Sequence, residues 1–192
     1  MKDKQLFDAL TESALSLGAT NASVITASEI PLDRQFREMC AVNACGVYGK
    51  CWMCPPDVGE IDALMAEVKG YDHALVYQTV TDLEDSFDYE GMIDARRGMS
   101  VLSQKMRRVF DRPEITRVLH LSVGGCGVCS ECTKKSGEPC RHPDLAMPSL
   151  EAYGVNVSQM AKVSGMKYIN GQDTVTYFGA VLFCAEEGAF DE

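Results

Sequence analysis

The distribution of cysteines constrains this sequence more than any other feature. Eight of the nine cysteines fall into two windows of fifteen residues each. The upstream group consists of Cys40, Cys45, Cys51 and Cys54, and the downstream group consists of Cys126, Cys129, Cys132 and Cys140. The N-terminus leads into an amphipathic pattern rather than a hydrophobic signal segment, so we expect a cytoplasmic protein with reduced thiols. Cysteines that cluster at short spacing in a reducing compartment indicate metal ligation.

The downstream group has the spacing C-x2-C-x2-C, followed after seven residues by a fourth cysteine. A loop of this kind can wrap a [4Fe–4S] cluster with three thiolates, while the fourth ligand arrives from elsewhere. Gly124, Gly125 and Gly127 would let the backbone fold around such a cluster and aim N–H groups at its sulfurs. Zinc sites more often use two C-x2-C knuckles separated by a longer spacer. The sequence therefore favours [4Fe–4S] here, with zinc as the alternative.

The upstream group has the less regular spacing C-x4-C-x5-C-x2-C. Pro55 follows Cys54 directly, as a proline follows a cluster cysteine in ferredoxins. Tyr48 and Trp52 would shield a cluster from water. We therefore predict a second [4Fe–4S] cluster in this loop.

Three arrangements of the ligands stay open. If Cys51 is a ligand, four thiolates saturate the upstream cluster, which suits electron transfer. If Cys51 is a buried core residue, three thiolates leave one iron free for a substrate. The ligands could also cross over, with Cys54 serving the downstream cluster and Cys140 the upstream one. The predicted activity is thus electron transfer or that of a small oxidoreductase, and the alternative is a zinc-stabilised module that binds a partner protein.

Charged residues near the cysteines and elsewhere have plainer interpretations. Arg141 follows Cys140 and could donate to a cluster or fix the loop. His73 and His120 lie in predicted strands, where histidines are most often structural. One face of a predicted helix carries several basic side chains, which form a solvated face or dock an acidic redox partner; they are Arg96, Arg97, Lys105, Arg107 and Arg108.

Composition excludes several classes of function. The net charge is −10, from 18 basic and 28 acidic residues, which argues against binding to a nucleic-acid backbone. No apolar run approaches the ~20 residues that a membrane span needs. No glycine-rich phosphate motif opens a helix after a predicted strand. The expected partner is a redox protein or a small-molecule substrate.

Hydrophobic periodicity predicts alternating helices and strands. Strands are expected over residues 22–26, 73–80, 118–123 and 175–184, and helices over residues 6–17, 32–42, 57–68, 92–109 and 149–164. Asp57 and Glu60 form the expected capping pair of the third helix, and Gly154 is expected to break the last one before a second cap at Asn156 and Gln159. We expect an α/β or α+β fold, a single compact domain over residues 1–192 with about four strands flanked by helices. The cysteine loops, 40–56 and 124–144, are inserted into it.

The two motifs together resemble a known family. They read Cys-x4-Cys-Gly-x-Tyr-Gly-x2-Trp-x-Cys-Pro-Pro over residues 40–56 and Gly-x-Cys-x2-Cys-x2-Cys-x6-Pro-Cys-Arg-x-Pro-x4-Pro-Ser-x-Glu-Ala-x-Gly over residues 124–154. This order is similar to that of the predicted metal-binding family called domain of unknown function twenty-two eighty-four. The resemblance covers nearly the whole chain. The pattern of the family has no cysteine at the position of Cys51. It implies metal, in iron–sulfur form, at Cys40, Cys45, Cys54, Cys126, Cys129, Cys132 and Cys140.

Overall fold

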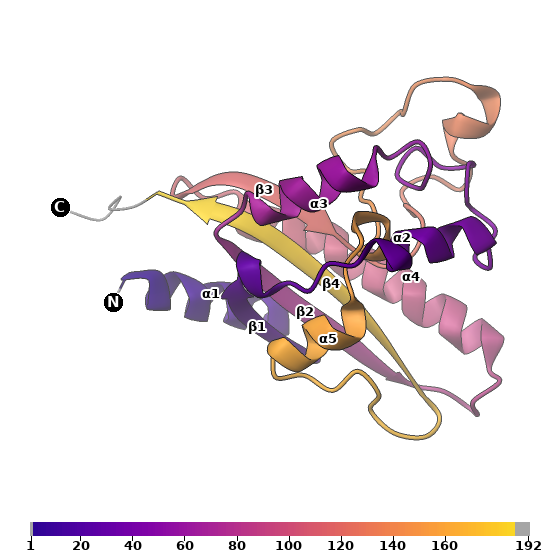
Figure 1. The fold of residues 1–192 in the computed structure, drawn as a ribbon. Coiled ribbons are helices and arrows are strands. Elements are labelled where there is room, and N and C mark those ends of the chain that lie inside the picture. The colour runs from indigo at the N-terminus through magenta and orange to yellow at the C-terminus, as the bar shows by residue number, and fades with distance from the viewer. Residues whose placement is uncertain (1, 187–192) are drawn as a thin grey trace.

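A four-stranded antiparallel sheet forms the centre of the protein. The computed structural model describes residues 2–186. The strands are β1 (Asn21–Thr26), β2 (His73–Asp82), β3 (Ile115–Leu121) and β4 (Thr174–Ala185). Their order is β1-β2-β4-β3, so the two longest strands lie in the middle (Figure 1).

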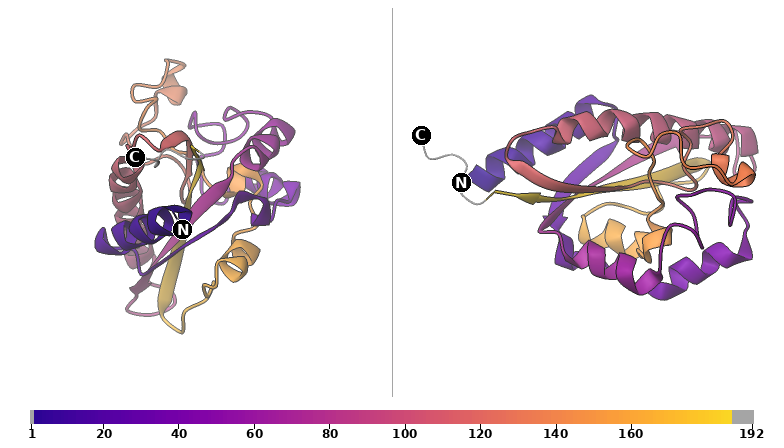
Figure 2. Two further views of the ribbon diagram at one scale, coloured as in Figure 1. Left: turned by 90° about the vertical axis from the view of Figure 1, so that its left-hand side faces the viewer. Right: turned by 90° about the horizontal axis from the view of Figure 1, so that it is seen from above.

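Helices cover both faces of this sheet. They are α1 (Lys2–Ser16), α2 (Arg34–Met39), α3 (Ile61–Lys69), α4 (Tyr89–Met106) and α5 (Val157–Val163). Short 3-10 turns span Ala27–Glu29, Cys40–Val42, Arg107–Phe110, Thr133–Ser136 and Glu151–Tyr153. Helices α1 and α4 lie on one face and α3 and α5 on the other (Figure 2).

The apolar residues of the central strands alternate between the two cores, because successive side chains of a strand point to opposite faces. Leu75 and Tyr77 of β2 pack in the α1/α4 core, whereas Ala74 and Val76 pack in the α3/α5 core. In the first core, Met99 of α4 is fully buried. The predicted α+β class, with four strands flanked by helices, is confirmed.

The predicted interruption of the last helix is also confirmed. Gly154 has the left-handed backbone (φ 74°) that ends the turn at Tyr153, and α5 begins after a second cap. There the Asn156 side chain accepts a hydrogen bond from the Gln159 N–H at 3.1 Å.

Two other boundaries differ from the prediction. Helix α3 has Glu60 at its N-cap without a side-chain cap, so the predicted capping pair of Asp57 and Glu60 is wrong. Asp57 instead forms an ion pair with Lys134, 77 residues further along the chain. The second helix begins at Arg34 rather than Leu32, because Leu32 forms a β-bridge with Val155.

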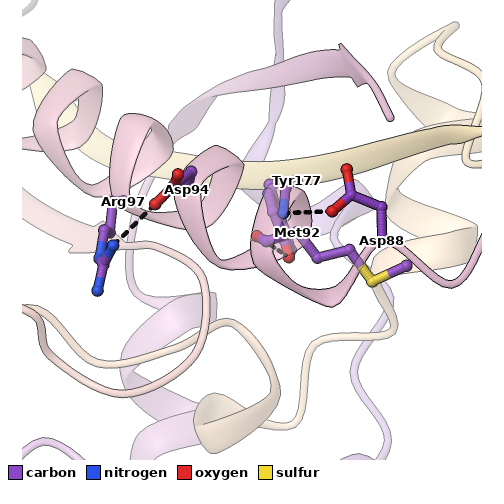
Figure 3. A network of polar contacts seen from close by, with 6 residues as sticks. Asp88, Met92, Asp94, Arg97 and Tyr177 are labelled. Atoms are coloured by element: carbon purple, nitrogen blue, oxygen red, sulfur yellow. Dashed lines mark hydrogen bonds and ion pairs between the residues drawn. The ribbon is translucent and has the colours of Figure 1, made fainter. Parts of the chain in front are cut away.

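The N-terminal half of α4 is anchored by polar contacts (Figure 3). Asp88 caps the helix by accepting from the Gly91 N–H at 2.8 Å. The Tyr177 hydroxyl of β4 donates to the Met92 carbonyl at 3.0 Å, which ties the helix to the sheet. This helix therefore has a fixed position beside β4.

Both cysteine loops lie at one end of the sheet, and the start of α1 and the end of β4 lie toward the other end (Figures 1 and 2). Within residues 2–186 no helix is both long enough and apolar enough to cross a membrane.

Candidate metal centre

The two cysteine loops are joined by polar contacts between residues far apart in the sequence. The Trp52 indole N–H of the upstream loop donates to the Glu138 carbonyl of the downstream loop at 3.0 Å. Lys134 lies 4.3 Å above the same indole ring and pairs with Asp57. The side chains of Lys134 and Asp57 are only 23% and 18% exposed, so solvent screens this pair less than a surface pair.

A glycine allows the loops to approach this closely. A Cβ at Gly125 would lie 3.0 Å from the Val47 methyl carbon and 3.5 Å from the Cys54 sulfur. Any larger residue at this position would push the upstream loop away from the downstream loop. Gly125 thus sets the distance between the two loops.

The upstream loop is shaped by local turns. Cys40 begins the 3-10 turn that follows α2, and this turn ends at Asn43, whose backbone is left-handed (φ 57°). The Asn43 side chain accepts from the Tyr48 N–H at 3.0 Å. A further turn brings the Cys54 N–H to the Cys51 carbonyl at 3.0 Å. Defined turns therefore place Cys40, Cys51 and Cys54.

The downstream loop is closed by side chains that bond to its own backbone. The Thr133 hydroxyl donates to the Pro139 carbonyl at 2.9 Å. Arg141 donates to the Glu131 carbonyl at 2.8 Å, so its guanidinium fixes the loop between Cys132 and Cys140. This agrees with the loop-fixing interpretation of Arg141.

Five of the eight clustered thiols surround one small hollow between the loops. These thiols belong to Cys51, Cys126, Cys129, Cys132 and Cys140. Trp52, Met53 and His142 also line the hollow. Its volume is about 20 Å³, roughly the space of one water molecule. Cys51 of the upstream loop, rather than Cys54, thus joins the downstream cysteines.

The other three thiols, from Cys40, Cys45 and Cys54, belong to the upstream loop. Cys54 is buried, whereas Cys45 is exposed. Cys54 contacts Cys51 and lies close enough to Cys40 and Cys45 for their charges to raise its pKa. Cys54 therefore lies between the hollow and the rest of the upstream group.

The protonation of the two thiols at the junction is coupled. The pKa of Cys51 is lowered to about 6, chiefly because a hydrogen bond from the Cys54 side chain stabilises the Cys51 thiolate. Burial opposes this shift, and hydrogen bonds from the Cys126 backbone and the Cys132 side chain support it. The pKa of Cys54 is raised, first by its hydrogen bond to Cys51 and then by burial. Cys51 is thus poised as a thiolate, the form that binds metals.

Burial and nearby carboxyl groups act on other members of the site. Burial raises the pKa of Cys126, and backbone N–H groups partly offset this effect. The pKa of Cys40 is raised first by burial and then by the charge of Glu151. Burial likewise raises the pKa of Glu151 itself. A largely buried carboxyl group therefore lies near the upstream thiols.

All nine cysteines are free thiols. Cys184 of β4 lies apart from the two groups. Its sulfur lies 3.9 Å from the carbonyl oxygen of Gly70, the residue that ends α3. In the described part of the chain, no three His, Cys, Asp or Glu side chains are placed as ligands of a single metal ion. Which of the eight clustered thiols bind metal stays a prediction.

A buried polar network beside the site was missed in the sequence. The Tyr77 hydroxyl lies 2.7 Å from both the Ser103 hydroxyl and His120 Nε2. Ser103 in turn lies 2.8 Å from the Ser122 hydroxyl. The one signal in the sequence was Ser103, a hydroxyl residue directly after Leu102 on the apolar face of α4.

The fold and the site define a cysteine-rich α+β protein whose clustered thiols meet at one end of an antiparallel sheet. The family described as "Predicted metal-binding protein (DUF2284)" matches residues 23–183, so the chain belongs to this family. The resemblance noted in the two motifs is therefore confirmed. No curated protein and no solved structure gives a significant match.

Proposed function

We propose that the joined cysteine loops hold iron–sulfur clusters, two of the [4Fe–4S] type, in a cytoplasmic redox protein. Its work would be electron transfer to a partner protein or the reduction of a small molecule. One observation carries the proposal: eight free thiols from two distant segments gather at one end of the sheet, five of them around one hollow. Such a donor set suits the thiophilic iron of a cluster.

The eight thiols fall into a set of five around the hollow and a set of three beside it, which supports two adjacent cluster sites. Cys126, Cys129 and Cys132 would provide three ligands of one cluster, and Cys51 or Cys140 the fourth, since both line the same hollow. Cys40, Cys45 and Cys54 would hold the second. The hollow is small as it stands, so a cluster would be accommodated by an outward shift of the loops. The glycines of the downstream loop and the exposed position of Cys45 allow such a shift.

The surroundings of the hollow suit a redox centre. A bound [4Fe–4S] cluster supplies one-electron transfer. Trp52 and Met53 line the hollow and would limit the access of water to a bound cluster, while the indole is held in place by Glu138 and Lys134. Exclusion of water and backbone N–H groups near the sulfurs are the protein's means of tuning a potential.

The direct test is anaerobic purification followed by iron and acid-labile sulfide analysis and EPR after reduction. We expect about eight irons per chain for two clusters. About four irons would leave one cysteine group structural. A colourless protein with stoichiometric zinc would refute the proposal and favour the zinc-stabilised module.

The role of Cys51 has its own test. Because Cys51 lines the hollow with four downstream cysteines, Cys51→Ala should lower the iron content. Cys184→Ala is the matched control, since Cys184 lies outside both groups. Full retention of iron in Cys51→Ala would exclude Cys51 as a required ligand.

A second candidate is an enzyme that binds a small substrate at the three-thiol group. The favouring observation is that Cys45 is exposed while Glu151, which is only partly exposed, lies near Cys40. An upstream EPR signal that changes when a small ligand is added would support this enzyme. A signal that no ligand alters would leave electron transfer as the function.

A further inference from the structure

A large groove runs along α4 beside the cysteine loops. Its volume is about 1300 Å³. Its walls come from α4, from β3 and from both cysteine loops, and Cys51, Cys126 and Cys129 lie at one side of it. The volume exceeds the roughly 300–1,000 Å³ of an ordinary ligand pocket, so a small molecule fits within it.

The groove is basic although the protein is acidic. Six basic and two acidic residues line it, in a chain of net charge −10; they are Lys50, Arg96, Arg97, Arg107, Arg108, Lys135, Asp111 and Glu131. A concave surface lined by one sign of charge focuses the field and attracts ions of the opposite sign. The groove is thus locally positive, whereas the protein as a whole is negative.

Within residues 2–186, four of the six cations form no ion pair with a carboxylate. Arg97 pairs with Asp94 at 2.7 Å, and Lys135 pairs with Glu131 at 3.2 Å. Arg96, Arg107 and Arg108 have no carboxylate partner within residues 2–186. These three guanidinium groups are available to an anion from outside.

Two of the three arginines, Arg96 and Arg107, lie beside other parts of the groove wall. The Arg96 guanidinium lies against Gly124, at the start of the downstream cysteine loop, because a Cβ added there would be 3.5 Å from Nη1. Arg107 lies near His120, whose pKa its charge helps to lower. The hydrogen bond between Tyr177 and Met92 holds the N-terminal half of α4, which carries Arg96, whereas Arg107 begins the 3-10 turn that follows this helix (Figure 3).

One residue that lines the groove also has a buried polar atom without a partner among the described residues. His120 lines the groove and is only 6% exposed. Its Nε2 is engaged by Tyr77, whereas its Nδ1 is buried and has no hydrogen-bond partner among the described residues. A buried polar group without a partner costs about 1–3 kcal/mol, so such groups in native proteins commonly serve a ligand or water. This observation is independent of the arginines.

We propose that this groove binds a small anionic molecule carrying phosphate or carboxylate groups, held by Arg96 and Arg107, and that a side-chain shift on binding lets a polar group of the molecule reach the otherwise buried His120 Nδ1. Guanidinium groups suit such anions because they donate paired hydrogen bonds in one plane. The buried position of His120 favours a small molecule over an acidic protein surface. Binding itself does not require a cluster, but a role for the anion as the redox substrate rests on the proposed function.

The test is calorimetric titration of the anaerobically purified protein with 3-phosphoglycerate, which carries both anionic groups. Inorganic phosphate and glutarate, titrated separately, distinguish the two chemistries. We expect at least one probe to bind with a Kd below about 1 mM. We expect Arg96→Gln and Arg107→Gln to weaken binding about tenfold each, because each removes a charge-assisted hydrogen bond. Lys162→Gln on α5, across the sheet, removes the same charge and should leave binding unchanged.

A pair of His120 variants tests the contact to Nδ1. His120→Gln keeps a polar atom near Nε2 and removes Nδ1, so it should weaken binding. His120→Asn keeps a polar atom near Nδ1 and should bind more tightly than His120→Gln. Circular dichroism checks that each variant is folded, and the variants of the half-buried Arg96 and Arg107 decide the matter if neither histidine variant folds.

Two outcomes would overturn the proposal. One is that none of the three probes binds more tightly than about 10 mM. The other is that the arginine variants bind as the Lys162→Gln control does. Iron content, measured on the same samples, shows whether the cysteine loops are intact, so a failure of the groove is distinguishable from a failure of the proposed metal centre.

Discussion

Tyr77→Phe removes one hydroxyl group from the buried network between α4 and the sheet. The Tyr77 side chain is fully buried, and its ring lies across Gly179 of β4, where a Cβ would come within 2.4 Å of it. The ring therefore keeps its place when the hydroxyl is removed. The substitution isolates the loss of the contacts to Ser103 and His120, each 2.7 Å long.

The expected loss of stability depends on which hydrogen bonds Ser103 and His120 keep in the variant. Ser103 keeps its contact with Ser122 at 2.8 Å, whereas His120 loses the only partner that its ring has among the described residues. The loss of a net hydrogen bond costs about 1 kcal/mol, and the buried unpaired ring nitrogen adds about 1–3 kcal/mol. We expect Tyr77→Phe to lower the free energy of unfolding by about 2–4 kcal/mol, a large part of the roughly 5–15 kcal/mol of a typical domain.

The assay is urea unfolding followed by circular dichroism, on preparations of equal iron content. Tyr168→Phe is the matched control, because Tyr168 is 50% exposed and its hydroxyl should contribute within about 0.5 kcal/mol. If Tyr77→Phe and Tyr168→Phe unfold at the same urea concentration with the same slope, the argument for the buried network is refuted.

Three further predictions concern the core, the pH dependence and the junction of the loops. The pKa of His120 is lowered to about 3, first by burial. Because folding favours the neutral imidazole, the protein has its full stability above the unfolded pKa of about 6.5. The free energy of unfolding falls as the pH drops below this value, by about 2 kcal/mol at pH 5. Urea unfolding of His120→Gln should therefore show a weaker pH dependence. Met99→Ala should cost about 2–5 kcal/mol in the same assay, because Met99 is fully buried between α4 and the sheet, and a cost below about 1 kcal/mol would contradict this packing. Asp57→Asn should weaken the pair with Lys134 and free the indole of Trp52, the one tryptophan of the chain, which shifts its fluorescence emission to longer wavelength; an unchanged spectrum would contradict the proposed junction.

Local patterns in the sequence predicted most of the fold. All four strands and the first four helices lie where periodicity placed them, within a few residues at their ends, whereas α5 begins at Val157 and only a 3-10 turn lies in the first part of the helix predicted over residues 149–164. The cap at Asn156 was also predicted, because its partner Gln159 is three residues away. Signals that act over one or two turns can be found in the sequence alone.

The errors and omissions arise from contacts between distant segments. Asp57 has a local pattern typical of a helix cap, but the ion pair with Lys134 from the other loop competes for it. The strand order likewise depends on which faces pack together, and no local signal encodes it. The same holds for the candidate site, since only folding brings Cys51 to the hollow of the downstream cysteines. The spacing of the cysteines predicted a metal-binding protein, in agreement with the family match, whereas the grouping of the thiols around the hollow required the structure.

Iron–sulfur clusters in the joined cysteine loops can be detected by X-ray absorption at the iron and zinc edges, on protein purified without oxygen. If the loops bind such clusters, we expect an iron edge with sulfur ligands and a second shell of iron–iron scattering, both diminished in a Cys126→Ala variant. A zinc edge with Zn–S distances of about 2.3 Å and no iron would contradict this expectation.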